Sequence, residues 1–274
     1  KNFVKNEFKK NIDVFCYAIG AGSEFPQCFL NLNRKKEMKR VIDESLNEVS
    51  SYIKFLKPKF FFPAGGTYMI YGKYHKLNKY VAKPSFLEVK NKISPLKTKV
   101  FNLIGGGSIC LNEKKYIVNQ SNLKKKKNFE KKFLDQIKNV KYYYSNNKNK
   151  IDLDELNNIF ESAKNNYFKF LSKKNIKAKW DFNFKIFKNY EINDNCLIDR
   201  KKSKFLKTYQ LKNHNLNAKK AFKLECYLEY ELFKSLLIGK FPWNTSLSGS
   251  TIMYKRNPNK FNVDMVFSLN FLRV

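Results

Sequence analysis

The strongest constraint on the fold is a strand, loop, helix and strand pattern near the start of the chain. Residues Ile12 to Ile19 are apolar almost without a break, which predicts a strand buried on both faces. From Arg34 to Leu56 apolar residues recur at helical spacing, which predicts an amphipathic helix. Pro58 ends this helix, and Phe60 to Phe62 form a second short strand. Because such crossovers are right-handed, the two strands are expected to be parallel.

A glycine-rich loop follows each of these strands. The first runs from Gly20 to Phe29 (GAGSEFPQCF), and the second runs from Pro63 to Gly66. Ligands of parallel sheets bind beyond the carboxyl ends of the strands, and glycine lets main-chain amides approach a ligand closely. We therefore expect a substrate-binding rim, unless both loops are ordinary turns; its residues are Gly20, Gly22, Pro26, Gln27, Cys28, Gly65 and Gly66. Cys28 is not expected to be a nucleophile, because no histidine lies nearby to lower its pKa.

The second half of the chain has a different composition and residue pattern. Residues 119–150 contain a basic run and a low-complexity stretch from Tyr142 to Lys150, which predict a linker and a surface loop. Asp152 then begins a predicted helix. Alternating apolar and polar residues predict strands at Trp180 to Ile186 and Phe222 to Leu228, followed by a short helix from Tyr230. Residues 151–274 are therefore expected to form an α+β accessory domain with an antiparallel sheet.

The charge of the chain has a compositional explanation. Lys plus Arg total 55 against 23 Asp plus Glu, which gives a formal net charge of +32. Only five of the basic residues are arginine, and the abundant Lys, Asn, Phe, Ile and Tyr all have AT-rich codons. An AT-rich genome therefore accounts for much of the charge, and Lys lacks the bidentate fork with which Arg reads nucleic acid. A nucleic-acid partner is not the leading expectation.

The sequence also bears on the cellular location of the protein and on metal binding. No stretch approaches the roughly 18 consecutive apolar residues of a membrane helix, and no secretory signal pattern opens the chain, so a cytoplasmic protein without membrane contact is expected. The five cysteines show no zinc or iron–sulfur spacing, so we expect reduced, buried thiols. The chain begins at Lys1 and reaches a strand almost at once, so we expect a fragment of a longer protein.

Three segments together resemble a known family. The stretch from Ile12 to Phe29, the long helix, and the stretch from Phe55 to Gly72 (FLKPKFFFPAGGTYMIYG) are similar to the latter half of the metallo-β-lactamase fold. The segment from Leu236 to Phe261 looks like the closing segment of its hydroxylase branch, which includes CMP-N-acetylneuraminate hydroxylase and UDP-N-acetylmuramate hydroxylase-like proteins. The resemblance implies an α/β fold in which residues 1–118 form the C-terminal half of an αββα sandwich.

The resemblance also indicates which metal-ligand positions of the family have no ligand in this chain. Enzymes of this fold carry an HxHxDH run and a last His after a strand that ends in Pro, but here that last position corresponds to Ala64 or Gly65. No catalytic or metal-ligating residue is therefore expected in this chain, which alone is expected to be inactive. The resemblance implies zinc or iron in the full-length parent only, and a Rieske [2Fe–2S] centre in missing sequence or in an electron-transfer partner.

Four further residues are candidates for binding an anionic substrate such as a sugar nucleotide. His75 follows the second glycine loop, although an isolated His among Lys and Tyr is usually solvated. Trp243, Asn244 and Arg256 are the late candidates: the ring of Trp243 can stack on a base and Arg256 can hold a phosphate, but Trp243 can equally fill the core and Arg256 pair with a carboxylate.

The function expected first is a Rieske-linked hydroxylase component acting on an amino-sugar nucleotide. The first alternative is a generic metal-dependent hydrolase of the metallo-β-lactamase fold. The second alternative is a non-catalytic basic nucleic-acid-binding protein, whose affinity would fall steeply with salt. A pocket for an apolar ligand in the second half is a further possibility that no residue pattern tests.

Overall fold

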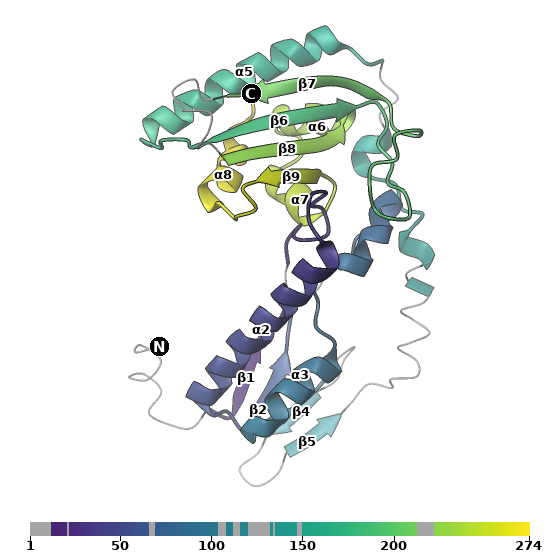
Figure 1. The fold of residues 1–274 in the computed structure, drawn as a ribbon. Helices are drawn as coiled ribbons and strands as arrows, with labels where there is room; N and C mark the ends of the chain where they lie inside the picture. Colours follow the sequence, from purple (N-terminus) through teal and green to yellow (C-terminus); the bar gives the residue numbers. More distant parts are fainter. Residues whose placement is uncertain are drawn as a thin grey trace. The chain divides into compact units, whose positions relative to one another are not determined.

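The computed structural model describes residues 12–20, 22–65, 69–103, 108–111, 116–119, 132–133, 135–146, 150–212 and 222–274 (Figure 1). The chain divides into two compact units. Unit 1 consists of Lys1–Gly22, Lys35–Tyr68 and Tyr80–Gln136, and unit 2 consists of Ser23–Arg34, Met69–Lys79 and Ile137–Val274. This division differs from the expected boundaries at residues 118 and 150, because two early segments belong to unit 2.

Unit 1 contains the predicted parallel crossover. Strand β1 (Val14–Tyr17) leads to helix α2 (Arg34–Leu56) and strand β2 (Phe60–Pro63), and β2 lies between β1 and β3 (Lys99–Val100) in a parallel sheet. Helix α3 (Phe86–Ile93) and the 3-10 turn η2 (Ser94–Leu96) precede β3. Strands β4 (Ser108–Leu111) and β5 (Tyr116–Asn119) form an antiparallel pair. The predicted parallel strands and the bounds of the long helix are confirmed.

The core of unit 1 explains why these elements form. Helix α2 presents Leu46, Val49 and Ile53 at helical spacing, and all three are buried against Phe61 of β2. Two residues of α3, Val89 and Ile93, join the same cluster. Phe61 is fully buried, as expected for the central strand of a parallel sheet.

Unit 2 is built on a four-stranded sheet of order β7-β6-β8-β9. Its strands are β6 (Trp180–Phe187), β7 (Phe205–Leu211), β8 (Phe222–Glu229) and β9 (Met253–Asn257). Its helices are α5 (Leu153–Lys173), α6 (Tyr230–Leu237), α7 (Trp243–Ser248) and α8 (Val263–Ser268), with 3-10 turns η1 (Gly72–Tyr80), η3 (Tyr143–Asn146) and η4 (Leu269–Phe271). Asp152 caps α5 by accepting hydrogen bonds from the amides of Asp154 and Glu155, which confirms the predicted start.

The expectation of a purely antiparallel sheet is wrong. Strands β6 and β7 are antiparallel, as are β8 and β9, but β6 and β8 are parallel along their whole length. Strand β7 reverses the chain and β8 reverses it again, so β8 runs in the direction of β6. Because β8 pairs with β6 and not with β7, the two strands meet in parallel. The observed class is a general α/β mixture with small sheets.

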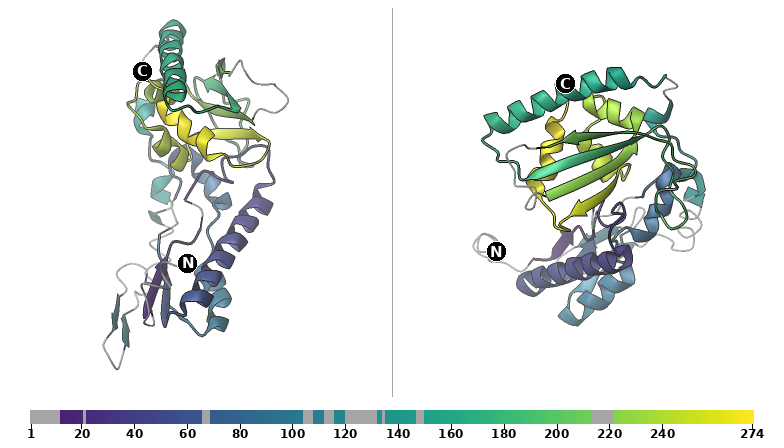
Figure 2. Two further views of the ribbon diagram at one scale, coloured as in Figure 1. Left: turned by 90° about the vertical axis from the view of Figure 1, so that its left-hand side faces the viewer. Right: turned by 45° about the horizontal axis from the view of Figure 1, so that its top comes forward.

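The helices of unit 2 cover one face of its sheet (Figures 1 and 2). Phe184 of β6 lies at the centre, with ring centroids 6.3 Å from Phe160 of α5, 5.2 Å from Phe233 of α6 and 5.8 Å from Trp243 of α7. The predicted surface loop at Tyr142 to Lys150 is corrected in part, because Tyr142 and Tyr144 are buried. None of the helices formed by described residues combines the length and the apolar character needed to span a bilayer.

Candidate functional site

Residues Ser23–Arg34, here named the docked loop, pair with β9 in unit 2 (Figure 1). The amide of Leu30 donates to the carbonyl oxygen of Tyr254 at 2.8 Å, and the amide of Tyr254 donates to the carbonyl oxygen of Cys28 at 2.9 Å. The rings of Phe29 and Tyr254 stack with centroids 5.3 Å apart. The loop therefore serves as a short extra strand beside β9 and is held by both main-chain and side-chain contacts.

Two of the chain's five arginines hold this loop in place. Arg34 donates from Nε to the carbonyl oxygen of Phe29 and from Nη1 to that of Cys196, both at 2.8 Å. The guanidinium of Arg256 lies 4.6 Å from the ring centroid of Phe29 and 5.1 Å from that of Phe25. Both arginines are buried. A planar guanidinium can stack on an aromatic ring while its N–H groups donate hydrogen bonds, whereas the ammonium of lysine has no planar face to stack.

The structure brings Pro26, Gln27 and Cys28 together with Arg256, all of which the sequence selected. Gln27 donates from Nε2 to the carbonyl oxygen of Ser23 at 2.6 Å and to Ser250 Oγ at 3.2 Å. Burial raises the pKa of the Cys28 thiol to about 12, so the thiol stays protonated and a poor nucleophile. Because all three side chains are buried, a ligand would reach them only if the docked loop moved.

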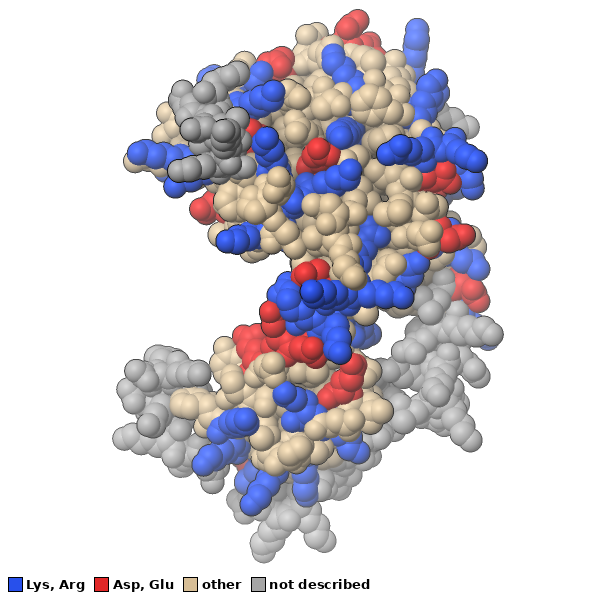
Figure 3. All heavy atoms as spheres, in the orientation of Figure 1, with Lys and Arg blue, Asp and Glu red and all other residues tan. Residues whose placement is uncertain are grey.

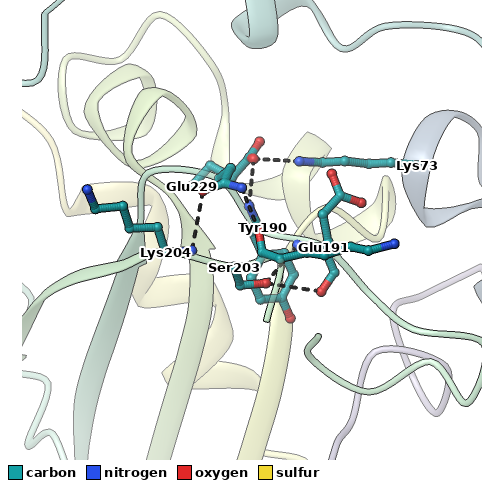
Figure 4. A network of polar contacts seen from close by, with 8 residues as sticks. Lys73, Tyr190, Glu191, Ser203, Lys204 and Glu229 are labelled. Atoms are coloured by element: carbon teal, nitrogen blue, oxygen red, sulfur yellow. Dashed lines mark hydrogen bonds and ion pairs between the residues drawn. The ribbon is translucent and has the colours of Figure 1, made fainter. Parts of the chain in front are cut away.

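A second feature of unit 2, here named the buried polar cluster, consists of Lys73, Tyr74, Tyr144, Tyr190 and Glu229. Lys73 donates to Glu229 Oε1 at 2.5 Å, and the amide of Tyr190 donates to the same oxygen at 3.1 Å (Figure 4). Glu229 closes β8 and is only 8% exposed. Burial raises the pKa of Glu229, while the Lys73 charge and the two hydrogen bonds partly oppose that rise.

Three phenols lie close enough to this carboxylate for its charge to contribute to raising their pKa. Tyr74, Tyr144 and Tyr190 are each at most 2% exposed, and their hydroxyl groups have no hydrogen-bond partner among the described residues. The ring centroids of Tyr74 and Tyr190 lie 5.8 Å apart. Burial holds the pKa of each phenol well above its usual value, so all three stay neutral donors. The cluster therefore offers one carboxylate with a raised pKa among unused neutral donors.

The predicted glycines that the structure describes lie in unit 1. Gly20 follows β1 and Gly65 follows β2, with φ angles of 108° and 61° in the region that favours glycine. The amide of Ala64 donates to the carbonyl oxygen of Tyr17 at 3.0 Å, so the two loops begin side by side at the carboxyl ends of β1 and β2. No atom lies within 4 Å of the position that a Cβ of Gly22 would take. Gly66 lies outside the described residues.

The remaining candidates have different surroundings. His75 lies in η1 with Nδ1 2.9 Å from the carbonyl oxygen of Gly72, so one ring nitrogen is engaged locally. Trp243 is 2% exposed and donates from its indole nitrogen to the carbonyl oxygen of Leu272 at 3.2 Å. The core-filling alternative for Trp243 therefore holds. Asn244, the next residue, is exposed.

Sequence reasoning missed Arg34 as a loop anchor and the whole buried polar cluster. The rarity of arginine was a usable signal, because an arginine kept in a lysine-rich chain indicates a need for its fork. Lys73 and Glu229 gave no signal, since nothing in their local sequence marks them as partners across 156 positions.

The residues that the structure describes do not fit a metal centre. No three His, Cys, Asp or Glu residues in the described parts of the chain are grouped so that they could hold a metal ion. The cysteines are free thiols, and Cys28, Cys196 and Cys226 are buried. His214 lies outside the described residues. These parts of the chain therefore supply neither the zinc or iron site nor the Rieske ligands that the resemblance implies.

No family model, curated protein or solved structure matched the chain. The function therefore has to be inferred from the geometry of its own residues.

Proposed function

We propose that the chain is the substrate-side part of a larger metallo-β-lactamase-fold protein, close to the sugar-nucleotide hydroxylases, that acts on an amino-sugar nucleotide. Zinc or iron and the Rieske centre would be supplied by other sequence of the parent or by an electron-transfer partner. In this proposal the described residues bind and orient substrate, and no chemical step is assigned to them.

The observation that carries the proposal is the contact between the docked loop and β9. The two segments quoted for the resemblance, Gly20 to Phe29 and Leu236 to Phe261, lie far apart in the sequence. Hydrogen bonds join Cys28 of the first to Tyr254 of the second, and Arg256 stacks on Phe29. Segments that resemble one family at both ends of a chain and meet in space are consistent with a single shared architecture.

The hydrolase alternative is weaker at one position. A hydrolase of this fold presents a histidine after the strand that ends in Pro63, but here Ala64 follows. Its amide is hydrogen-bonded to Tyr17. Neither Ala64 nor Gly65 has a side chain that can coordinate a metal.

The nucleic-acid alternative is weakened by the distribution of charge. On the face drawn in Figure 3, acidic side chains lie among the basic ones over unit 2. Several lysines are paired with carboxylates, for example Lys185 with Glu225 at 3.0 Å and Lys234 with Glu155 at 2.5 Å. Such pairs reduce the phosphate-binding capacity that the net charge implies.

Ligand-dependent thermal unfolding tests the proposal. The chain is heated with UDP-N-acetylglucosamine or CMP-N-acetylneuraminate, and with N-acetylglucosamine as a control that lacks the nucleotide. Both tryptophans, Trp180 and Trp243, lie in unit 2, so their fluorescence reports unfolding of that unit. A ligand at 100 times its Kd stabilises the native state by about 2.7 kcal/mol, so a clear rise in Tm with the sugar nucleotides is expected.

A different pair of results would contradict the proposal. No shift with either sugar nucleotide, together with tight binding to duplex DNA that weakens linearly in log salt, would favour the nucleic-acid alternative. Reading the coding sequence upstream of Lys1 for HxHxDH and for Rieske ligands then tests the parent enzyme separately.

A further inference from the structure

A pocket of about 320 Å³ opens in unit 2 between the end of α6, the start of α7 and the α8–η4 segment. Its volume is at the lower end of the roughly 300–1,000 Å³ of ligand sites, so it fits one compact group and not a whole sugar nucleotide. The described residues that line it lie within Leu236–Arg273, inside unit 2.

One wall of the pocket is aromatic. Phe267 is 56% exposed, and its ring centroid lies 5.5 Å from that of Phe271 in an edge-to-face arrangement. Phe271 is supported from behind by Phe170 of α5, since the two rings stack with an interplanar angle of 7°. An exposed phenylalanine held against a fixed second ring offers a face on which a planar ligand can stack.

The pocket is also lined by polar side chains and one cation. Asn244, Asn270 and Arg273 line it, and Asn244 and Arg273 are exposed. Within the described part of the chain, the Asn244 amide and the Arg273 guanidinium have no hydrogen-bond or ion-pair partner. Asn270 uses only its Nδ2, which donates to the carbonyl oxygen of Phe267 at 3.0 Å. Donors, acceptors and a planar cationic fork are therefore available to a ligand.

We propose that this pocket binds the nucleoside monophosphate part of an anionic nucleotide. The base stacks on Phe267, the amide of Asn244 pairs with the polar edge of the base, and Arg273 holds the phosphate through two parallel hydrogen bonds. An aromatic acid without a polar ring edge would leave the amide unused, which favours a nucleotide. The inference rests on the proposed function, because it locates the nucleotide subsite of the proposed substrate.

The choice of arginine at this position supports the assignment. Only five of the 55 basic residues are arginine. Arg34 in the docked loop and Arg256 in β9 use their guanidinium groups for contacts within unit 2. Among the described residues, the side chain of Arg273 makes no such contact, since Asn166 donates only to the carbonyl oxygen of Arg273. Bidentate phosphate binding is the property that separates arginine from lysine.

Calorimetric titration of the chain with UMP tests the inference. Arg273→Ala is expected to weaken UMP binding by about 10- to 100-fold, because a charge-assisted hydrogen-bond pair is lost. The substitution keeps the Asn166 contact, which uses the main chain. Arg200→Ala, at an exposed arginine elsewhere in unit 2, is the matched control and should leave the Kd unchanged. Uridine and inorganic phosphate should each bind at least tenfold more weakly than UMP.

Two outcomes overturn the assignment, and each is distinct from failure of the proposed function. If UDP-N-acetylglucosamine binds the wild type and the Arg273→Ala variant equally, the proposed function survives and this subsite is wrong. If benzoate binds more tightly than UMP, the occupant is an aromatic acid and the nucleotide assignment fails. A third outcome would support the subsite and contradict the proposed function: UMP binding that depends on Arg273 while no sugar nucleotide binds.

Discussion

The ammonium of Lys73 donates a hydrogen bond to the carboxylate of Glu229, 156 residues further along the chain. The two side chains are 23% and 10% exposed. Water therefore screens this pair far less than the exposed ion pairs of the helices. The pair joins η1 to the end of β8, so the early segment Met69–Lys79 is anchored within unit 2.

Replacing Lys73 by Met is expected to destabilise unit 2 by about 3 kcal/mol at pH 7, because the Glu229 carboxylate loses its cation while its burial remains. The loss should shrink at pH 4, where Glu229 takes up a proton. Urea unfolding followed by tryptophan fluorescence measures both values. Lys164→Met is the control, because its partner Glu161 is 59% exposed, and it should cost less than about 1 kcal/mol. Equal costs at the two positions would contradict the role of burial.

Glu229→Gln is expected to change the pH dependence of stability. Burial raises the pKa of Glu229 above its ordinary value of 4.5, so the native state holds this proton more tightly than the unfolded state does. The stabilising contribution is complete below pH 4.5 and is lost as the pH rises through the native pKa. The free energy of unfolding of the wild type should therefore fall relative to that of the variant between about pH 4 and pH 7. A constant difference across that range would show that the pKa is not raised.

Arg256→Lys tests the stacking that holds the docked loop. The guanidinium lies over Phe25 and Phe29, and lysine would keep the charge but lose the planar contact. A loss of about 1 kcal/mol in the stability of unit 2 is expected. Arg200→Lys provides the control in the same unit and should have almost no effect. If both variants are equally stable, the stacking contributes nothing.

Thiol labelling tests the burial of the cysteines. Cys16 and Cys110 are exposed, whereas Cys28, Cys196 and Cys226 are buried. Burial raises the pKa of Cys28 to about 12, so almost no thiolate forms at pH 8. Ellman's reagent should therefore modify two thiols quickly in the native protein and five after denaturation. Rapid labelling of Cys28 would show that the docked loop opens readily.

The local elements were predictable wherever periodicity was strong. The apolar spacing of Arg34–Leu56 gave both ends of α2, and alternation located β6 and β8. Strand β7 was missed because its pattern is mixed, with Phe205 exposed and Tyr209 buried. The direction of β8 relative to β6 was missed because a strand's own residues do not record which neighbour it pairs with.

The candidate site, like the fold, was predictable only in part. Pro26, Gln27, Cys28 and Arg256 were selected from motifs, and the structure brings them together. Their burial was not predicted, because it depends on β9 lying beside the docked loop. Trp243 was left open between ligand and core, and its packing against Phe184 decided for the core.

The parallel crossover of unit 1 and the long helix could be predicted from the sequence alone, because each depends on neighbouring residues and local geometry. The tertiary fold places Ser23–Arg34 beside β9 and brings Lys73 to Glu229. These relationships join residues far apart in the chain, and they are fixed by burial and pairing across the fold, which no local pattern encodes.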